Sequence, residues 1–368
     1  MKKQVISLRQ AISTLAMFIT GSSVILGGAT GAGQDSWISL LFSMALVIPT
    51  VLVYARIMKL FPEKSIYEII EILFGRFVGK IIIILLTWYA LHLAALVFRN
   101  FSEFIEIVSM PETPQLPIML VLLLVTVYLA KSGIQTIGKW AIIVLFILLT
   151  VLFLTVFLLL NQMDFTNILP IMNHSTKTIL AGSYRLFSFP FAETVLFLSL
   201  ADSIKKEDSP YKVYVYGVSL GAIILLLVIL RNIEALGPAL YESSQFPSYT
   251  AARIINVGDF LARVEGTISM NFILTGITKI TICLLAASKG LCSLFQIKDY
   301  KKVVFPVGLT AMALASIIYK SAIQMLNFIK IYEIYAILFQ IVIPVLIWVG
   351  AEIKTRDEKK GKEESTFQ

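Results

Sequence analysis

Cysteine and histidine are both scarce in this chain of 368 residues, which contains two of each. Because Cys283 and Cys292 lie in or at the end of one apolar segment, the sequence excludes a disulfide framework and offers no metal-ligand spacing. His92 and His174 are too few for a metal-binding triad, and the sequence has no nucleophile-elbow, phosphate-loop or zinc-helix motif. We therefore expect no bound metal, no cofactor and no enzymatic activity.

Charged residues are also few, at 15% of the sequence, whereas hydrophobic residues make up 58%. A soluble globular domain usually has more charged and fewer hydrophobic residues than this. Apolar segments of about 20 residues recur along the chain, and this is the length at which a helix crosses the hydrocarbon core of a bilayer. The sequence therefore predicts an all-α integral membrane protein with about ten transmembrane helices, at about residues 8–31, 37–60, 79–108, 116–131, 138–160, 178–200, 213–236, 266–291, 303–319 and 328–352.

The net charge of +8 is distributed according to the predicted membrane topology. Lys2 and Lys3 precede the first span, and Lys205 and Lys206 follow the sixth. In contrast, the loop over residues 32–36, on the other side of the membrane, contains no Lys or Arg. By the positive-inside rule both termini lie in the cytoplasm, so the basic residues indicate topology in a lipid membrane and not a nucleic-acid partner.

The sixth predicted span contains a helix break and an acidic residue at the same depth. Pro190, between Phe189 and Phe191, removes a backbone donor and clashes with the preceding turn, so a continuous helix is not expected. Glu193 follows at about the membrane midplane, where a carboxyl group is tolerated only against protein or a watery cavity. We expect a ligand site to be built around this break.

The first predicted span carries a second signal of this kind at Gly21–Ser23. Gly and Ser disfavour a regular helix, although small residues serve equally well for close helix packing. Interrupted spans that open two successive groups of five are typical of the leucine-transporter fold, an inverted five-plus-five repeat with helices 1 and 6 broken. We expect one transmembrane domain over residues 1–353, with repeats at about 8–160 and 178–352, and a disordered cytoplasmic tail over 354–368.

Ionisable residues also occur within the third and eighth spans. Arg99 and Glu103 are spaced to pair across one helical turn, either as a structural ion pair or with Arg99 available to bind a ligand carboxylate. In the eighth span Thr275 belongs to a polar stripe, with Lys279 next to it near the middle of the bilayer. Since an unpaired ammonium is costly there, we predict a pair between Glu193 and Lys279, with either a functional or a structural use.

Residues 61–77, between the second and third spans, predict an amphipathic helix on the cytoplasmic surface of the membrane. Ser65 and Glu68 form a capping box near its start. Its apolar residues fall on one face, and it is too charged to span the bilayer.

Several short motifs resemble those of a known family. The run over residues 6–10, then Gly21–Ser23, then Ala32-Gly33-Gln34-Asp35-Ser36-Trp37 resembles the amino-terminal signature of the spore germination permeases. These proteins are the B subunits of nutrient germinant receptors in endospore-forming bacteria, within the amino acid–polyamine–organocation superfamily. The segment 189–193 resembles the family's motif in the sixth span, with Ala192 where glycine is commoner.

The resemblance implies a leucine-transporter-like subunit of the spore inner membrane that acts with A and C partner subunits. It would bind a small nutrient, such as an amino acid, and so trigger germination, with Lys279 as a substitute for a coupling cation. The alternative hypothesis is a proton-coupled secondary transporter of amino acids or related small solutes. A third hypothesis is a scaffold with a vestigial pocket. The candidate ligand-binding residues are Gly21, Ser22, Ser23, Arg99, Phe189, Pro190, Phe191, Glu193 and Thr275.

Overall fold

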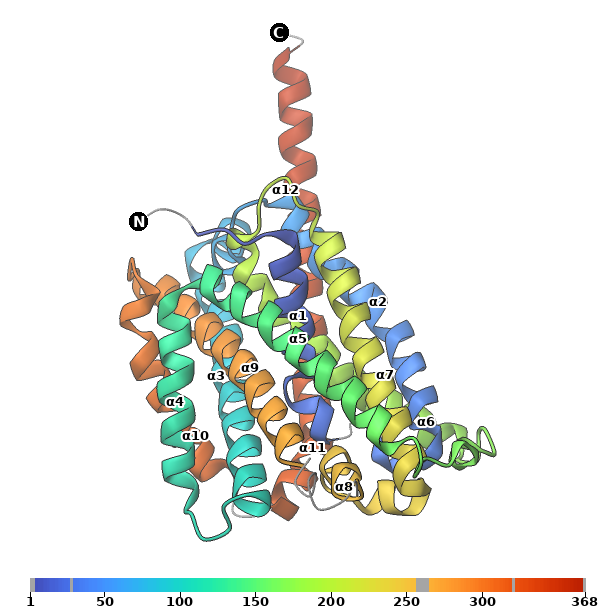
Figure 1. Cartoon of the computed structure of the whole chain (residues 1–368). Helices are drawn as coiled ribbons and strands as arrows, with labels where there is room; N and C mark the ends of the chain where they lie inside the picture. The colour runs from blue at the N-terminus through green and yellow to red at the C-terminus, as the bar shows by residue number, and fades with distance from the viewer. Residues whose placement is uncertain (1–3, 27–28, 256–264, 320–321, 367–368) are drawn as a thin grey trace.

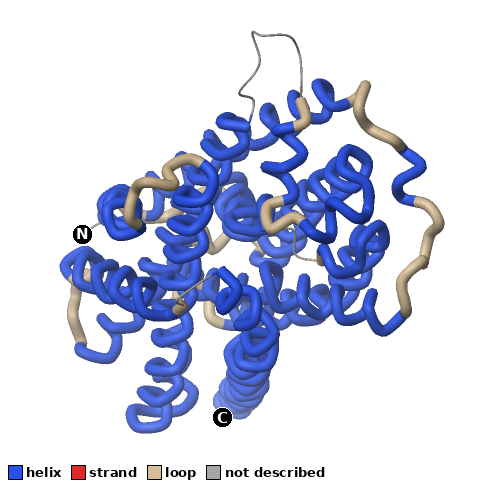
Figure 2. The backbone as a smooth tube through the Cα atoms, turned by 90° about the horizontal axis from the view of Figure 1, so that it is seen from below, coloured by secondary structure: helices blue, strands red, loops and turns tan. Residues whose placement is uncertain are grey.

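The computed structural model describes residues 4–26, 29–255, 265–319 and 322–366, which form a bundle of helices joined by short loops (Figure 1, Figure 2). The α-helices are α1 (Leu8–Leu26), α2 (Ser36–Leu60), α3 (Ile66–Val108), α4 (Gln115–Ser132), α5 (Ile134–Leu159), α6 (Thr176–Leu186), α7 (Pro210–Ser243), α8 (Pro247–Arg253), α9 (Glu265–Phe295), α10 (Val304–Ile318), α11 (Ala322–Ile337) and α12 (Ile343–Thr366). Short 3-10 or π-helical segments are η1 (Thr30–Asp35), η2 (Phe165–Ile168), η3 (Phe187–Phe191), η4 (Ala192–Ser203), η6 (Tyr300–Lys302) and η7 (Leu338–Val342).

The predicted spans correspond to helices of the structure. Eight helices within the described residues are long and apolar enough to cross a membrane. The other two predicted spans correspond to α1 and to the shorter apolar helix α10. Helix α1 packs against α5, α7 and α9, and its residues Leu15–Ile19 are fully buried. Because neighbouring helices cover α1, it needs fewer apolar residues than a helix that faces lipid.

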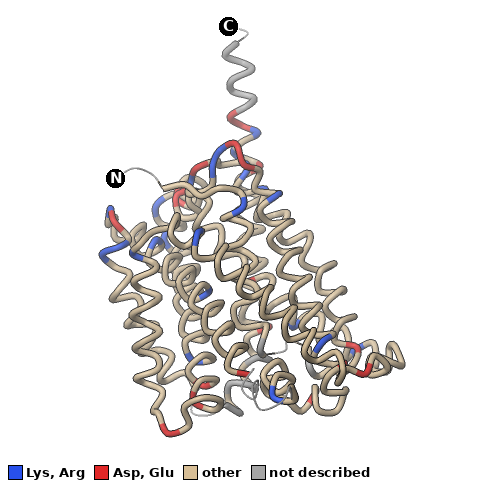
Figure 3. The backbone as a smooth tube through the Cα atoms, viewed as in Figure 1, with Lys and Arg blue, Asp and Glu red and all other residues tan. Residues whose placement is uncertain are grey.

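Both chain ends lie at the same end of the bundle (Figure 1). Figure 3 shows that most of the Lys and Arg residues also gather at this end. The positive-inside rule expects Lys and Arg to gather on one side of the membrane in this way. We refer to this end as the terminal end of the bundle.

The first turn of α3 carries the predicted capping box. The Ser65 side chain accepts a hydrogen bond from the backbone of Glu68, whose carboxylate in turn accepts from the Ser65 backbone at 2.7 Å. Gly75, with a φ of 68°, separates this surface segment from the membrane-spanning part of α3. The Tyr67 hydroxyl donates to the Ala286 carbonyl at 2.8 Å and so attaches the segment to α9.

The interruption of the sixth span lies where the sequence predicts it. Helix α6 ends at Leu186, and Phe189 leaves the helical conformation, with φ −135° and ψ 112°. Pro190 has no N–H to donate, which removes one hydrogen bond of the helix at this point. The chain continues from Ala192 as the 3-10 helix η4, so the span consists of two helical pieces with a break between them.

The first span has no interruption at Gly21–Ser23, where the sequence predicts one. Helix α1 runs without a break through Gly21–Ser23 and ends at Leu26, after which η1 leads into α2. The Ser23 hydroxyl donates to the Ile19 carbonyl at 3.1 Å, within the same helix. The small residues at this position therefore serve close packing, which was the other use that their composition allows.

The carboxyl-terminal segment also differs from its prediction. Residues 354–368 are expected to be disordered, yet α12 continues as a helix to Thr366 and projects beyond the bundle (Figure 1). A helix that leaves the membrane is already nucleated, so that each further turn costs little.

Candidate ligand site at the centre of the bundle

The predicted pair between Glu193 and Lys279 is present at the centre of the bundle. The Lys279 Nζ atom lies 2.5 Å from the Glu193 Oε2 atom, and both side chains are fully buried. Glu193 is placed by the first turn of η4, directly after the break, and Lys279 by the middle of α9. In such surroundings neither charge would be tolerated without the other, because each has lost its water.

The second oxygen of Glu193 begins a chain of hydrogen bonds. The Tyr332 hydroxyl donates to Glu193 Oε1 at 2.6 Å and lies 3.0 Å from the Tyr89 hydroxyl, which accepts from Gln340 Nε2 at 2.9 Å. The same Gln340 nitrogen donates to the Ser188 carbonyl at 2.7 Å, so a carbonyl at the helix break has a partner. This chain links α11, α3 and η7 to the ion pair.

Sequence reasoning missed the three residues of this hydrogen-bonded chain, of which Tyr332 contacts Glu193 directly. A buried tyrosine requires a hydrogen-bond partner for its hydroxyl, and a buried glutamine requires several, so polar residues within apolar spans are the signal that could have found them. The signal does not say which span each one faces, because Tyr89, Tyr332 and Gln340 lie far apart in the sequence.

Aromatic rings enclose the ammonium group of Lys279. Its Nζ atom lies 4.6 Å from the centre of the Phe189 ring and 5.3 Å from that of Phe18. The ring of Phe189 reaches this position because its backbone leaves the helix at the break. A cation over an aromatic face is stabilised by the ring quadrupole, so these rings suit ammonium groups in general.

The predicted residues of the first and eighth spans meet beside this ammonium group. The Thr275 hydroxyl donates to the Gly21 carbonyl at 3.0 Å, and Ser22 Oγ lies 3.4 Å from Lys279 Nζ. A Cβ atom at Gly21 would come within 2.8 Å of the Lys279 Cβ and Cδ atoms. Gly21 is therefore where the stem of Lys279 passes closest to α1. Phe191 and Pro190 are buried at the break itself.

Arg99 forms a separate cluster. Its Nη2 atom lies 3.1 Å from Glu103 Oε2, as the spacing predicts, and Gln115 Nε2 donates to the same carboxylate at 3.0 Å. Within the part of the chain that the structure describes, Arg99 makes no hydrogen bond or ion pair with Glu193 or Lys279. The geometry thus favours the structural ion pair over a carboxylate-binding role at the central site.

At the end of the bundle opposite the chain termini, a polar group that we call the outer latch joins η1, the loop before α6 and α7. It consists of Asp35, His174 and Glu242. Asp35 accepts hydrogen bonds from the backbone N–H groups of Met172 and His174, both at 2.8 Å. The two ring nitrogens of His174 each lie 3.0 Å from a carboxylate oxygen, Nδ1 from Asp35 and Nε2 from Glu242. Asp35, a residue of the amino-terminal signature, therefore fixes the loop before α6.

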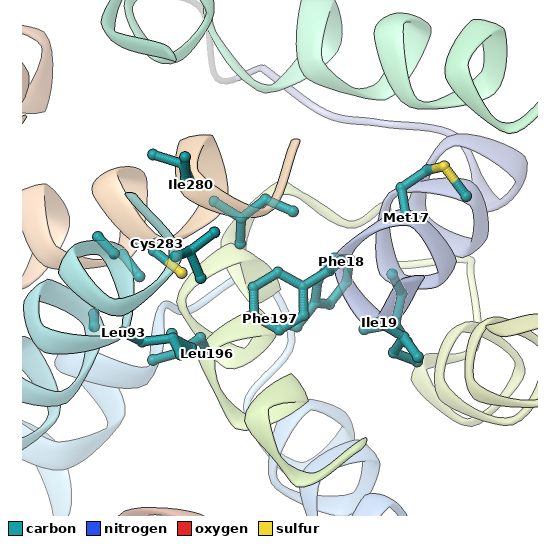
Figure 4. Packing of buried hydrophobic residues seen from close by; sticks show 14 of the residues in the cluster. Met17, Phe18, Ile19, Leu93, Leu196, Phe197, Ile280 and Cys283 are labelled. Carbon is teal, nitrogen blue, oxygen red and sulfur yellow. The ribbon is translucent and has the colours of Figure 1, made fainter. Parts of the chain in front are cut away.

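At the terminal end, η4 is joined to the amino-terminal segment and to α9. The Ile6 N–H donates to the Ser203 carbonyl at 2.9 Å. Lys289 of α9 pairs with Asp202 at 2.7 Å. Between these contacts and the central site the helices pack through apolar side chains, labelled in Figure 4: Phe18 and Ile19 from α1, Leu196 and Phe197 from η4, and Ile280 and Cys283 from α9. The central site is thus buried between the two sets of contacts.

Solved structures with the same fold are membrane transporters. The structure of MhsT in complex with L-phenylalanine covers 95% of this chain and 89% of its own, with a TM-score of 0.67 and 11% identity. A mutant manganese transporter of Eremococcus coleocola covers 95% of this chain and 84% of its own, with a TM-score of 0.65 and 12% identity. These similarities show that the chain has the leucine-transporter-like fold. With its long apolar helices, this fold defines the class as a multi-pass integral membrane protein.

The sequence comparisons narrow this class to a family. The family described as spore germination protein matches residues 5–325. Spore germination protein KB of Bacillus subtilis (strain 168) is 26% identical over 370 residues, which cover 99% of both chains. The putative spore germination protein YfkT of the same organism is 28% identical over 353 residues, or 96% of both chains. The chain belongs to the spore germination permease family, as its motifs indicate.

Removing one partner of the central ion pair should destabilise the protein strongly. We expect Glu193→Ala to lower the free energy of unfolding by about 3–5 kcal/mol, because Lys279 is left buried without a counter-charge. The double variant Glu193→Gln/Lys279→Gln should recover most of that loss. Thermal and denaturant unfolding of the purified protein in detergent micelles measure both effects. A single variant as stable as the natural chain would contradict the pairing.

Substitution of Gly21 should also be costly. We expect Gly21→Ala to lower the free energy of unfolding by about 1–3 kcal/mol, because the added methyl group overlaps a lysine stem that its ion pair holds in place. Gly31→Ala is the matched control, since nothing lies within 4 Å of a Cβ atom at Gly31. Equal effects of the two substitutions in the same unfolding assay would be inconsistent with this packing.

Loss of the outer latch should make the central site accessible from the end of the bundle at which the latch lies. We expect Asp35→Ala to increase, by roughly an order of magnitude, the rate at which a membrane-impermeant maleimide modifies a cysteine introduced as Ser22→Cys, in a background with Cys283 and Cys292 replaced. Glu112→Ala, in another loop at the same end, is the control. An unchanged rate in Asp35→Ala would show that the latch does not limit access.

Proposed function

We propose that this chain is the nutrient-sensing B subunit of a spore germinant receptor. It binds a small ligand, such as an amino acid, at the break of the sixth span, and binding biases a complex with A and C subunits towards germination. In this proposal the protein lies in the spore inner membrane with both termini in the cytoplasm. Family membership and the fold shared with a transporter bound to L-phenylalanine support it.

The observation that carries the proposal is the buried pair of Glu193 and Lys279 beside the break. A free amino acid carries one ammonium and one carboxylate group, which are the two groups that this pair brings together. The ligand's ammonium can take the place of Lys279 against Glu193, next to the Phe189 ring, while its carboxylate pairs with the displaced lysine. Because a zwitterion adds no net charge, the site stays electrically neutral on binding, and desolvation is compensated.

The same geometry suggests how binding is sensed. Lys279 satisfies Glu193 from within the protein, so this carboxylate needs no external cation. A ligand that separates the pair must move Phe189 and the Tyr332 hydroxyl, which contact the two charges. These residues belong to η3 and α11, and α11 also contacts α6 through Arg185 and Glu333, whose Nε and Oε1 atoms lie 3.0 Å apart. Ligand binding can therefore shift helices that reach the surface of the subunit.

A proton-coupled secondary transporter is the second candidate. The hydrogen-bonded chain from Glu193 through Tyr332 and Tyr89 to Gln340 favours it, because such chains can relay a proton to a buried carboxylate. In that case Glu193 would gain and lose a proton as the site opens to alternate sides.

Binding and uptake of amino acids distinguish these functions. We expect saturable binding of at least one radiolabelled amino acid to the protein in lipid nanodiscs, measured with and without its partner subunits. The double variant Glu193→Gln/Lys279→Gln should weaken this binding at least about tenfold, because it removes both charges that the ligand needs.

The matched control is Arg99→Gln/Glu103→Gln, which removes another buried ion pair and should leave affinity within about twofold. Equal loss of binding in both double variants would contradict a site at Glu193 and Lys279. In liposomes, accumulation driven by a proton gradient would favour the transporter, whereas binding without accumulation supports the sensor.

A further inference from the structure

Away from the central ion pair, another charge is buried at Arg231 of α7. Its side chain is 3% exposed, and its guanidinium donates to neutral oxygen atoms. The Nη1 atom donates to Thr155 Oγ1 at 2.9 Å, and the Nε and Nη2 atoms donate to Asn232 Oδ1 at 3.1 and 2.7 Å. These contacts use three of the five N–H groups of a guanidinium.

The positive charge of Arg231 has no counter-charge in the described part of the chain. No carboxylate oxygen there lies within 4 Å of its guanidinium nitrogens, although Glu234 is on the same helix. Since arginine stays ionised in proteins, a full positive charge is buried here. Burial of an unpaired ion costs several kcal/mol, which a structure normally offsets with a partner of opposite charge.

A small cavity adjoins this guanidinium. The cavity has room for about one water molecule or ion of similar size, and Arg231, Asn271 and Ser248 contribute the polar part of its lining among apolar residues of α1, α5, α7 and α9. The side chain of Asn271 is 6% exposed, and its Oδ1 atom is buried without a hydrogen-bond partner. The Ser248 hydroxyl is already engaged, since it accepts from Asn232 at 3.1 Å and donates to the Val24 carbonyl. The cavity therefore holds an unsatisfied amide oxygen next to a guanidinium that has no carboxylate partner in the described residues.

We propose that this cavity binds a single monovalent anion of halide size, such as chloride. The two remaining N–H groups of Arg231 donate to the ion, and the Asn271 amide turns by half a rotation about its last bond so that its NH₂ group does the same. A water molecule would fit the volume and satisfy Asn271 but would leave the charge of Arg231 unbalanced. A carboxylate attached to an amino acid is too large for this space, so the site is distinct from the proposed nutrient site.

The bound ion would stabilise the packing of four helices at once. The cavity is lined by Val24 of α1, Leu148 of α5, Arg231 of α7 and Asn271 of α9. Because α1 and α9 also carry Gly21 and Lys279, an anion here would favour the arrangement in which the central site is closed. Anything that binds only the folded state raises its stability by mass action.

Chloride-dependent thermal unfolding of the full chain in detergent micelles tests the proposal. We expect the melting temperature to rise by about 3–6 °C when sodium chloride replaces sodium gluconate at constant ionic strength and saturating concentration. Sodium bromide should act like chloride, and sodium acetate should act like gluconate because acetate exceeds the cavity. Arg231→Gln should abolish the shift, and Asn271→Leu should raise the half-maximal chloride concentration at least about tenfold.

Arg185→Gln is the matched control, because it removes an arginine whose charge is paired with Glu333, and it should keep the full chloride response. The proposal would be overturned if chloride did not change the melting temperature of the natural chain. It would also be overturned if the Arg231→Gln variant kept the shift. An equal rise of the melting temperature with acetate would overturn the proposal that the site admits only anions of halide size. Should Arg231→Gln fail to fold, an unchanged chloride response in Asn271→Leu would overturn it as well.

Discussion

A single ion pair, between Glu193 and Lys279, constrains the centre of this molecule. Both side chains are removed from water, so each charge depends on the other and on the groups around it. The break in the sixth span brings the ring of Phe189 to the ammonium group, and Gly21 leaves room for the lysine stem. Any change in the position of η4, α9 or α1 alters this contact, which makes it a suitable element for reporting a bound ligand.

The buried site lies between two sets of polar contacts, one at each end of the bundle. The outer latch attaches the Asp35 segment to the loop before α6, and the amino-terminal segment at Ile6 pairs with the chain at Ser203. In a transporter the two ends open in alternation, whereas a sensor needs only the outer one to admit its ligand. The architecture therefore accommodates both functions, and the difference lies in whether the terminal end opens after binding.

Much of this arrangement follows from local features of the sequence. Apolar length predicts the spans, the missing donor of Pro190 predicts the break, and the cost of an unpaired ammonium predicts the partner of Lys279. Side-chain contacts between distant spans could not be predicted, which is why Tyr332 was missed as a partner of Glu193. At Gly21–Ser23 the composition is compatible with both a helix break and close packing. The contact of Gly21 with the Lys279 stem of α9, which the sequence does not reveal, favours close packing.

The most direct measurement is a structure of the protein with a bound amino acid, determined in lipid nanodiscs. We predict ligand density between α1, η3 and α9, with the ligand's ammonium against Glu193. The distance between Glu193 Oε2 and Lys279 Nζ should increase from 2.5 Å to beyond hydrogen-bonding range. Ligand density elsewhere in the bundle, with the Glu193–Lys279 contact unchanged, would contradict binding of the ligand between these two residues.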